Sequence, residues 1–160
     1  MDITGEYHVP LPREAVFAAL NDPDVLGRCI PGCEALEQVG EHEYSADVVA
    51  KIGPVKARFQ ATITVSNLNP PQSYTLSGEG RGGAAGFASG SADVSLEAVD
   101  EETVLRYTAS IRPGGKIAQV GSRLMGGTAR KLGADFFSRF VEVVTPAPPS
   151  GEGGPAGQEE

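Results

Sequence analysis

Hydrophobic and polar residues alternate along most of the chain, as in strands with one buried and one exposed face. The clearest case is residues 55–65, where every second residue is hydrophobic and the residues between are polar or charged. Short turn sequences rich in Gly, Pro, Asn or Asp separate the alternating segments. The pattern predicts an antiparallel sheet, with strands over residues 3–9, 43–52, 55–65, 73–80, 91–99 and 103–111.

Helical periodicity replaces this alternation in three places. Residues 11–20 and 23–28 predict two short helices after the first strand, the first with Pro12 in its opening turn. Residues 116–144 carry a broad hydrophobic stripe at helical spacing, and the sheet is the surface that can cover it. The fold class predicted is α+β, a curved antiparallel sheet of about seven strands wrapped around a long C-terminal helix.

The composition changes abruptly near the end of the chain. Residues 145–160 consist mainly of Pro, Gly and Glu and, Pro aside, contain no hydrophobic residue larger than Ala. Such a segment cannot bury enough surface to offset its ordering entropy. We therefore expect one folded domain, residues 1–144, followed by a disordered tail or linker, residues 145–160.

A glycine-rich segment, GEGRGGAAGFASG at residues 78–90, raises the possibility of a phosphate-binding loop. Such a loop needs a strand before it and a helix N-terminus after it, because the helix end supplies free N–H groups. Here strands are predicted on both sides. The segment therefore predicts a hairpin that allows close approach of a ligand or a protein, with Phe87 as a hydrophobic tip.

Charge and cysteine content narrow the classes of partner. A net charge of −8 argues against nucleic acid as the main partner. Residues 116–144 are locally basic, which suits either an anionic surface or a solvated helix face. Cys29 and Cys33 lack the further ligands that a zinc site needs, so we expect free thiols and no metal. Without an apolar leader or span, we expect a cytoplasmic protein.

Candidate catalytic groups are scarce. His8 falls on the polar face of the first strand, and both histidines are predicted to be exposed. The sequence therefore offers no pocket histidine for a Ser-His-Asp arrangement. No carboxylate pair falls on an inward strand face. We therefore expect no enzymatic activity and assign no catalytic residue.

The inward strand positions include many small residues: Ala46, Ala50, Ala57, Ala61, Ala92 and Ala109. A curved sheet lined by small residues and wrapped on one helix predicts an apolar cavity suited to an apolar ligand; a tightly packed core is the alternative. Tyr44, Tyr74 and Tyr107 share the inward face and could meet one another. They serve either as polar groups for a ligand carbonyl or as ordinary core residues.

Several strings together resemble the CoxG family, named for the G subunit of carbon monoxide dehydrogenase, within the helix-grip or START-like (SRPBCC) fold. They are LNDPDVLGRCIPGCEALE (20–37), KIGPVKARF (51–59), GEGRGGAAGFASGSADVSL (78–96), LRYTASI (105–111) and GGKIAQVGSRL (114–124). The resemblance implies a non-enzymatic accessory of a molybdenum-containing carbon monoxide dehydrogenase. It also implies recruitment to the inner face of the cell membrane and a quinone, such as menaquinone, held in the helix-grip cavity. This chain has the family's linker-like start from Thr145 without an apolar segment after it, so we expect direct anchoring to need a C-terminal segment that is not in this sequence.

From the residues and the resemblance together we expect the ligand cavity to be lined by Phe17, Leu20, Phe59, Tyr74, Tyr107, Ile117, Val120, Leu124 and Met125. We expect the cavity mouth or a partner surface at Ile30, Pro31, Phe87 and Arg123. Two alternative functions stay open. One is an assembly or docking module for the dehydrogenase without a small ligand, and the other is a cyclase- or hydrolase-type enzyme of the same fold.

Overall fold

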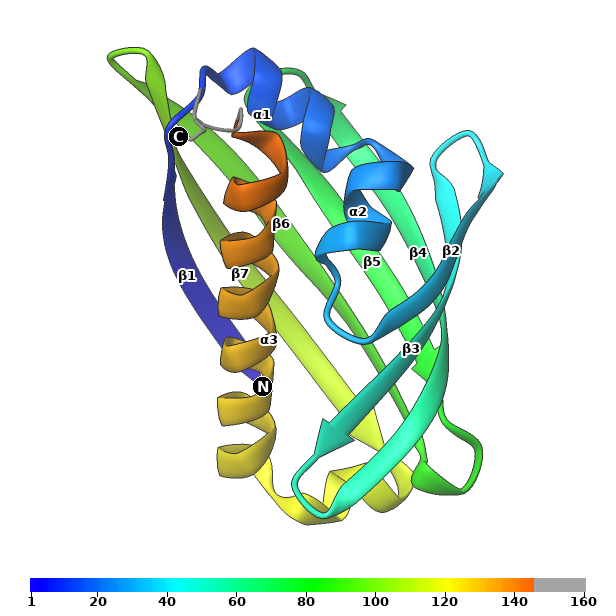
Figure 1. The fold of residues 1–160 in the computed structure, drawn as a ribbon. Coiled ribbons are helices and arrows are strands. Elements are labelled where there is room, and N and C mark those ends of the chain that lie inside the picture. Colours follow the sequence, from blue (N-terminus) through cyan, green and yellow to red (C-terminus); the bar gives the residue numbers. More distant parts are fainter. Residues whose placement is uncertain (146–160) are drawn as a thin grey trace, which may run out of the picture.

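The protein is described by a computed structural model covering residues 1–145, in which one long helix lies along a curved antiparallel sheet (Figure 1). The seven strands follow the order β1-β7-β6-β5-β4-β3-β2. Their bounds are β1 (Asp2–Val9), β2 (Cys33–Gly40), β3 (Glu43–Ile52), β4 (Val55–Asn69), β5 (Ser73–Arg81), β6 (Phe87–Val99) and β7 (Glu102–Gly114). The helices are α1 (Arg13–Leu20), α2 (Pro23–Cys29) and α3 (Ser122–Val144), and two 3₁₀ turns are η1 (Gly83–Ala85) and η2 (Gly115–Val120).

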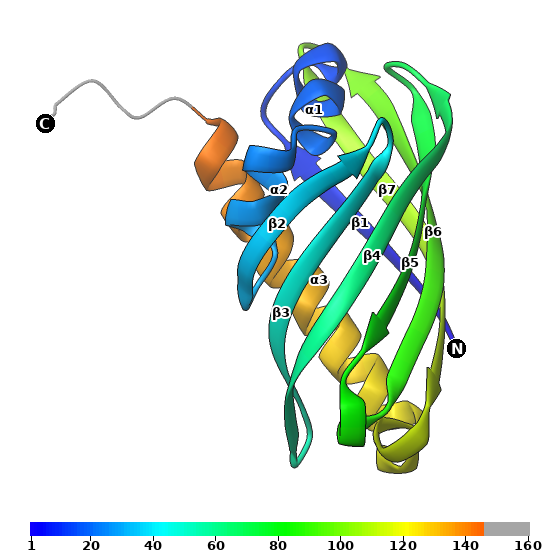
Figure 2. The ribbon, with the colours of Figure 1, turned by 90° about the vertical axis from the view of Figure 1, so that its right-hand side faces the viewer.

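The helix-grip fold predicted from the sequence is confirmed. Figure 2 shows α3 along one side of the sheet, with α1 and α2 over the end where α3 finishes. We call this the upper end and the opposite one, where η2 precedes α3, the lower end. Each strand pairs antiparallel with its neighbours, and its alternating hydrophobic residues face α3. The predicted tail, residues 145–160, lies outside the described residues apart from Thr145.

A side-chain cap marks the start of α2, whereas α1 follows Pro12 without one. The Asp22 side chain caps α2 by accepting a hydrogen bond from the Asp24 N–H at 2.9 Å, and Pro23 occupies the first helical position. α1 buries Val16, Phe17 and Leu20, the face predicted from the sequence. Both helices thereby cover the upper end of the sheet.

The long helix begins later than the sequence predicts. We expected it from residue 116, but residues 115–120 form η2, and α3 starts at Ser122. Gly121 lies between them with a φ of 94°, a conformation that glycine adopts without strain and that an α-helix cannot continue through. The start of α3 is thereby displaced, and η2 closes the lower end of the sheet.

The buried core consists of two separate clusters. The larger one, at the upper end, joins α1, the upper strands and Phe140 of α3. The smaller one, at the lower end, contains Ile52, Val55, Phe59, Ala85, Ile117 and Met125. The sheet between them is only partly buried on its inner face, and this gap positions the candidate site.

Candidate ligand-binding site

An apolar cavity of about 390 Å³ lies against the inner face of the sheet, between the two core clusters. Three rows of register partners form its floor. They are Leu76, Ala92 and Ala109; Ile63, Gly78, Gly90 and Ile111; and Ala61, Gly80 and Ala88. All ten residues are partly exposed although they face inward. A wide-open apolar space therefore lies over the small inward residues, and its volume falls in the range of about 300–1,000 Å³ usual for small-molecule sites. None of the nine residues expected to line a ligand cavity belongs to this floor.

Small residues on both walls create this space. Seven of the ten floor residues are Ala or Gly, so the sheet projects little volume toward α3. Across the cavity, α3 presents Gly126, Ala129 and Gly133 at helical spacing. A Cβ at Gly133 would lie 3.2 Å from Tyr107 Oη, and one at Gly126 would lie 3.5 Å from Met1 Sδ. The two glycines therefore let α3 come close to Met1 and to the ring of Tyr107.

Two tyrosines mark the upper rim of the cavity. Tyr74 pairs with Val94 and Val94 with Tyr107, so the three residues form the sheet row directly above the Leu76 row. Tyr74 is 4 % exposed and its ring meets that of Phe17 edge-on at 5.5 Å. Its hydroxyl forms no hydrogen bond with residues 1–145, and burial raises the Tyr74 pKa well above its usual range. A buried hydroxyl without a protein partner is a costly group that a ligand oxygen or a water can satisfy.

The tyrosines do not form the single cluster that the sequence suggested. Tyr44 donates to the Asn21 carbonyl at 3.4 Å, while Tyr107 stacks with Tyr7 at a centroid distance of 6.2 Å and with Phe137 at 6.4 Å. Burial raises the Tyr107 pKa, and so do the charge and hydrogen-bonding capacity of nearby Tyr7, while Arg130 lowers it. The Tyr7 hydroxyl also faces Gly133, so it is a rim group that the sequence reasoning missed, although it shares the inward parity of its strand.

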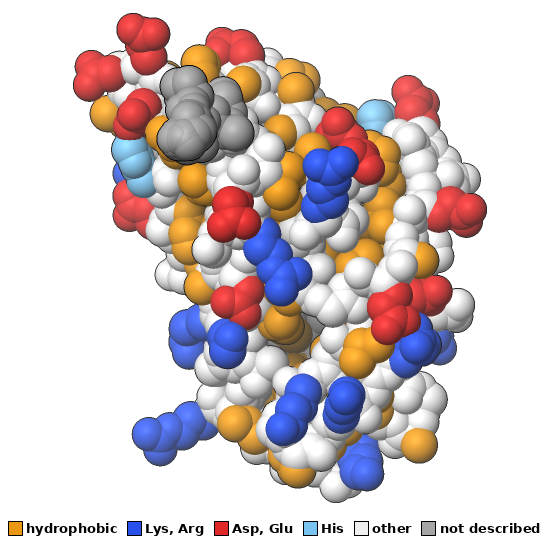
Figure 3. Space-filling view, in the orientation of Figure 1, with side chains coloured by type: hydrophobic (Ala, Val, Ile, Leu, Met, Phe, Trp, Pro, Cys, Tyr) orange, Lys and Arg blue, Asp and Glu red, His pale blue; other side chains and the backbone are white. Residues whose placement is uncertain are grey.

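The cavity opens beside the edge of β3. β2 pairs with β3 from Val48 upward, and the Val49 N–H donates to the Gly32 carbonyl at 2.9 Å, which fixes the α2–β2 loop there. Below this point β3 has no partner strand on that side, and its last residues pack against the start of α3 in the lower core cluster (Figure 1). Figure 3 shows hydrophobic side chains in the depth of this hollow. Ile30 and Pro31, expected at the mouth, lie on the loop that borders it from above.

The other predicted cavity residues frame the site. Phe17, Leu20 and Tyr74 belong to the upper cluster, while Phe59, Ile117, Met125 and Val120 belong to or pack on the lower one. Leu124 is 42 % exposed and rests on Gly53 of the β3–β4 turn, outside the cavity floor. Phe87, 53 % exposed, starts β6 on the outer sheet face across from Gly114, which leaves it as an exposed surface residue. Arg123 is exposed at the start of α3. Whether any of them binds a ligand stays a prediction.

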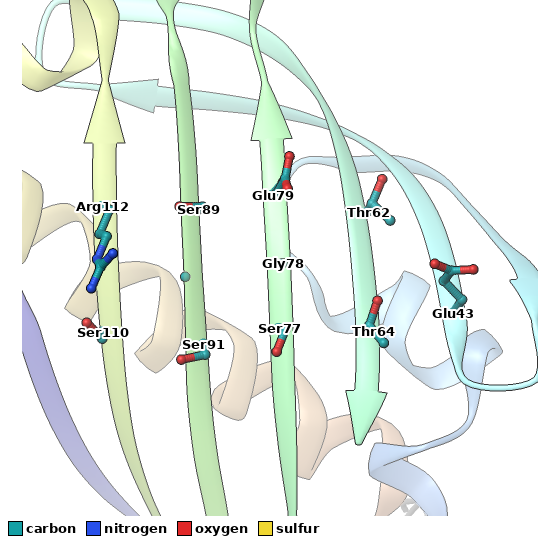
Figure 4. Close-up of a pocket in the computed structure, with 11 residues that line it drawn as sticks. Glu43, Thr62, Thr64, Ser77, Gly78, Glu79, Ser89, Ser91, Ser110 and Arg112 are labelled. Atoms are coloured by element: carbon teal, nitrogen blue, oxygen red, sulfur yellow. The ribbon is translucent and has the colours of Figure 1, made fainter. Parts of the chain in front are cut away.

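A larger recess of about 560 Å³ lies on the opposite, outer face of the sheet (Figure 4). Its side chains project away from α3, which lies behind the strands in this view. They are hydroxyls and charged groups: Thr62, Thr64, Ser77, Ser89, Ser91, Ser110, Glu43, Glu79 and Arg112. This wide, polar surface offers little to an apolar ligand, so the smaller inner cavity is the better candidate site.

The histidines and cysteines form no metal site in the described part of the chain. His8 Nε2 lies 2.9 Å from Glu102 Oε1 on an exposed strand face, and Cys29 and Cys33 are free thiols. Within residues 1–145, His, Cys, Asp and Glu form no group of three or more that could hold a metal ion. Over the same residues, no helix is both long and apolar enough to cross a bilayer.

The sequence matches a family model for the G subunit of carbon monoxide dehydrogenase (CoxG) over residues 5–145. A conserved protein from Geobacillus kaustophilus, known from its crystal structure, is 37 % identical and superposes with a TM-score of 0.85. The alignment covers 90 % of this chain and 95 % of that one. A search of curated protein sequences returned no significant match.

More distant structures share the fold alone. Ara h 8.0201 superposes with a TM-score of 0.64 at 16 % identity, covering 90 % of this chain and 97 % of that one. The Zhui aromatase/cyclase from Streptomyces sp. R1128 does so with a TM-score of 0.60 at 13 % identity, covering 90 % and 96 %. These likenesses support the helix-grip architecture. The chemistry of the cavity has to be argued from the residues of this chain.

Proposed function

Because the chain belongs to the CoxG family, we propose that it is a non-enzymatic accessory that binds a hydrophobic ligand for a molybdenum-containing carbon monoxide dehydrogenase. The ligand we propose is an isoprenoid quinone such as menaquinone, linking the dehydrogenase to the quinone pool of the membrane. On this proposal the protein works in the cytoplasm at the inner face of the membrane. The observation that carries the proposal is the apolar cavity between two separate core clusters.

The chemistry of the cavity fits a molecule with a long apolar part and a few acceptor oxygens. The floor is aliphatic, which suits an isoprenoid chain. Tyr74 and Tyr107 lie at the rim, and their hydroxyls are protonated at neutral pH because the ordinary pKa of tyrosine is about 10 and burial raises it further. Protonated hydroxyls donate hydrogen bonds, and quinone carbonyls accept them. We propose the head group at this rim and the chain along the Ala and Gly floor.

One observation favours a second candidate, a docking module for the dehydrogenase without a small ligand. Phe87 is 53 % exposed on the outer sheet face beside Arg81 and Gly114, and its side chain belongs to neither core cluster. Exposed aromatic side chains are common anchors in protein interfaces. In that case Phe87 should matter for complex formation and the cavity should be incidental.

The first experiment is to produce the 160-residue chain in a menaquinone-rich host, extract it with organic solvent and identify the extract by mass spectrometry. We expect a stoichiometric isoprenoid quinone. Ala92→Leu and Ala109→Leu place a branched side chain in the floor and should remove the quinone from the extract. Ser91→Leu, on the outer face next to Ala92, is the matched control and should retain it.

Either outcome decides between the candidates. A quinone in the wild type and in Ser91→Leu, absent from both floor variants, supports the carrier. An empty wild-type extract that also takes up no added menaquinone overturns it. Complex formation with the dehydrogenase that depends on Phe87 and persists in the floor variants would then support the docking module.

A further inference from the structure

The positive charge of this acidic protein is concentrated at its lower end. Three segments meet there, residues 50–57, 81–90 and 111–127. They contain Lys51, Lys56, Arg81, Arg112, Lys116 and Arg123 and neither Asp nor Glu. The rest of the sequence carries seven Lys or Arg against 21 Asp or Glu. Figure 3 shows the blue side chains gathered over the lower part of the molecule and most of the red ones above. We call these three segments the basic end.

Packing brings the segments together into one surface. Besides Phe59, the lower core cluster consists of residues from the three segments, and each segment contributes at least one: Ile52, Val55, Ala85, Ile117 and Met125. Gly53 in the β3–β4 turn lies against Leu124 and Val120, and Gly86 lies against Gly114 and Lys116. Lys51, Lys56, Lys116 and Arg123 therefore lie around one small core at one end of the protein, and Arg81 and Arg112 lie on the outer sheet face beside it.

These cations are exposed and almost all lack a carboxylate partner within the described part of the chain. Arg81 alone forms an ion pair, with Glu79 at 3.5 Å. Lys51 and Lys56 are direct register partners across the β3–β4 hairpin. Like charges placed opposite one another destabilise a strand pair. An anionic surface at this end relieves that repulsion, whereas the acidic remainder of the protein is repelled by it.

Apolar groups accompany the cations. Leu124 and Phe87, 42 % and 53 % exposed, belong to the same segments. The cavity opening between α3 and β3 lies directly above this end (Figure 3). Cations beside exposed apolar side chains match the head-group region of an anionic bilayer, where both kinds of group are accommodated.

We infer that the basic end is a docking surface for an anionic lipid bilayer, which brings the cavity opening to the membrane so that the ligand enters from the acyl phase. Docking itself stands on the charge distribution, while ligand entry rests on the proposed function. A membrane-facing opening spares a water-insoluble ligand the free-energy cost of crossing water.

The test is flotation of the full chain, stripped of ligand by solvent, with vesicles of phosphatidylcholine alone or with about one lipid in three replaced by phosphatidylglycerol, the anionic fraction that attracts basic segments. We expect binding to the anionic vesicles that weakens with added salt, and little binding to the neutral ones. The quadruple variant Lys51→Gln, Lys56→Gln, Lys116→Gln and Arg123→Gln should bind at least about 100-fold more weakly, since each cation contributes roughly fivefold.

A matched control removes four cations elsewhere: Arg13→Gln, Arg28→Gln, Lys131→Gln and Arg139→Gln. It has the same net charge and should bind within about threefold of the wild type, because charges beyond a Debye length are screened. Leu124→Asn should weaken binding at high salt, with Leu132→Asn, also exposed on α3, as its control. Circular dichroism confirms that each variant is folded.

Equal loss in the two quadruple variants, or binding that the basic-end variant retains, overturns the proposal. The proposal is also overturned, in favour of an acidic protein partner, if the wild type binds the dehydrogenase but not vesicles and only the basic-end variant loses that binding. Ligand entry is read as the rate at which menaquinone moves from the vesicles into the protein, which the basic-end variant should slow. The proposed function fails separately, if the wild type binds vesicles yet holds no quinone when menaquinone is added in detergent.

Discussion

The ring of Tyr107 on β7 lies flat across Gly5, its register partner on β1. A Cβ at Gly5 would fall 2.7 Å from Tyr107 Cζ and 2.8 Å from its Oη, closer than packed atoms approach. The absence of a side chain at Gly5 therefore lets Tyr107 reach toward Gly133 of α3. The rim of the cavity depends on this one glycine.

Replacing Gly5 by Ala should move the Tyr107 ring out of its site. We expect Gly5→Ala to lower the free energy of unfolding by about 1–3 kcal/mol, the usual effect of overpacking, measured by urea denaturation. Gly127→Ala is the control, because nothing lies within 4 Å of a Cβ there and α3 should gain up to about 1 kcal/mol. Equal stability of Gly5→Ala and wild type would show that the ring moves freely.

Removing the Tyr74 hydroxyl should leave the ligand-free protein as stable as before or more so. Its hydroxyl is buried without a partner in residues 1–145, so Tyr74→Phe should raise the unfolding free energy by up to about 3 kcal/mol. Tyr44→Phe instead removes a donor to the Asn21 carbonyl and should cost about 1 kcal/mol. If the proposed function holds, Tyr74→Phe also weakens menaquinone binding. A larger loss of stability for Tyr74→Phe than for Tyr44→Phe would contradict this account.

Stability should fall at alkaline pH because of the rim tyrosines. Burial raises the pKa of Tyr74 and Tyr107 above the ordinary value of 10.0. The unfolded chain therefore loses these protons first, and the native advantage is present below pH 10 and declines as pH rises above it. Each group contributes a slope of up to about 1.4 kcal/mol per pH unit. Unfolding measured from pH 8 to 11 should show the decline, and Tyr74→Phe should reduce its slope.

The β3–β4 turn should depend on Gly53 for two separable reasons. Gly53 has a φ of 61°, and a Cβ there would overlap Leu124. Gly53→Ala should cost about 1 kcal/mol from the backbone alone, more with the overlap. In a Leu124→Ala background the overlap is gone, so the same change should cost less. Additive losses in the double variant, measured by thermal unfolding, would show that the two residues do not interact.

The sequence by itself determined the fold. Alternation over residues 55–65 and its neighbours gave six of the seven strands their inward face, because successive side chains of a strand point to opposite sides. β2 (Cys33–Gly40) was not among the predicted strands. The strings around residues 20–37 and 78–96 indicated the family. The small inward residues, Ala92 and Ala109 among them, predicted the cavity, because the volume of a side chain is fixed by its type.

The tertiary structure decided where the cavity lies and what borders it. Large residues such as Phe17 and Ile117 were expected to line the space, but they pack with one another into the two end clusters. The small residues between the two clusters therefore form the floor of the cavity. Strand register from β5 to β7 put Tyr74 and Tyr107 in one row, and the placement of α3 put Tyr7 beside them. The start of α3 depended on the positive φ of Gly121. Glycine permits this conformation, but the packing of the folded chain decides whether it is adopted. The basic end required three segments distant in sequence to share one small core, a relationship that periodicity along a single chain does not contain.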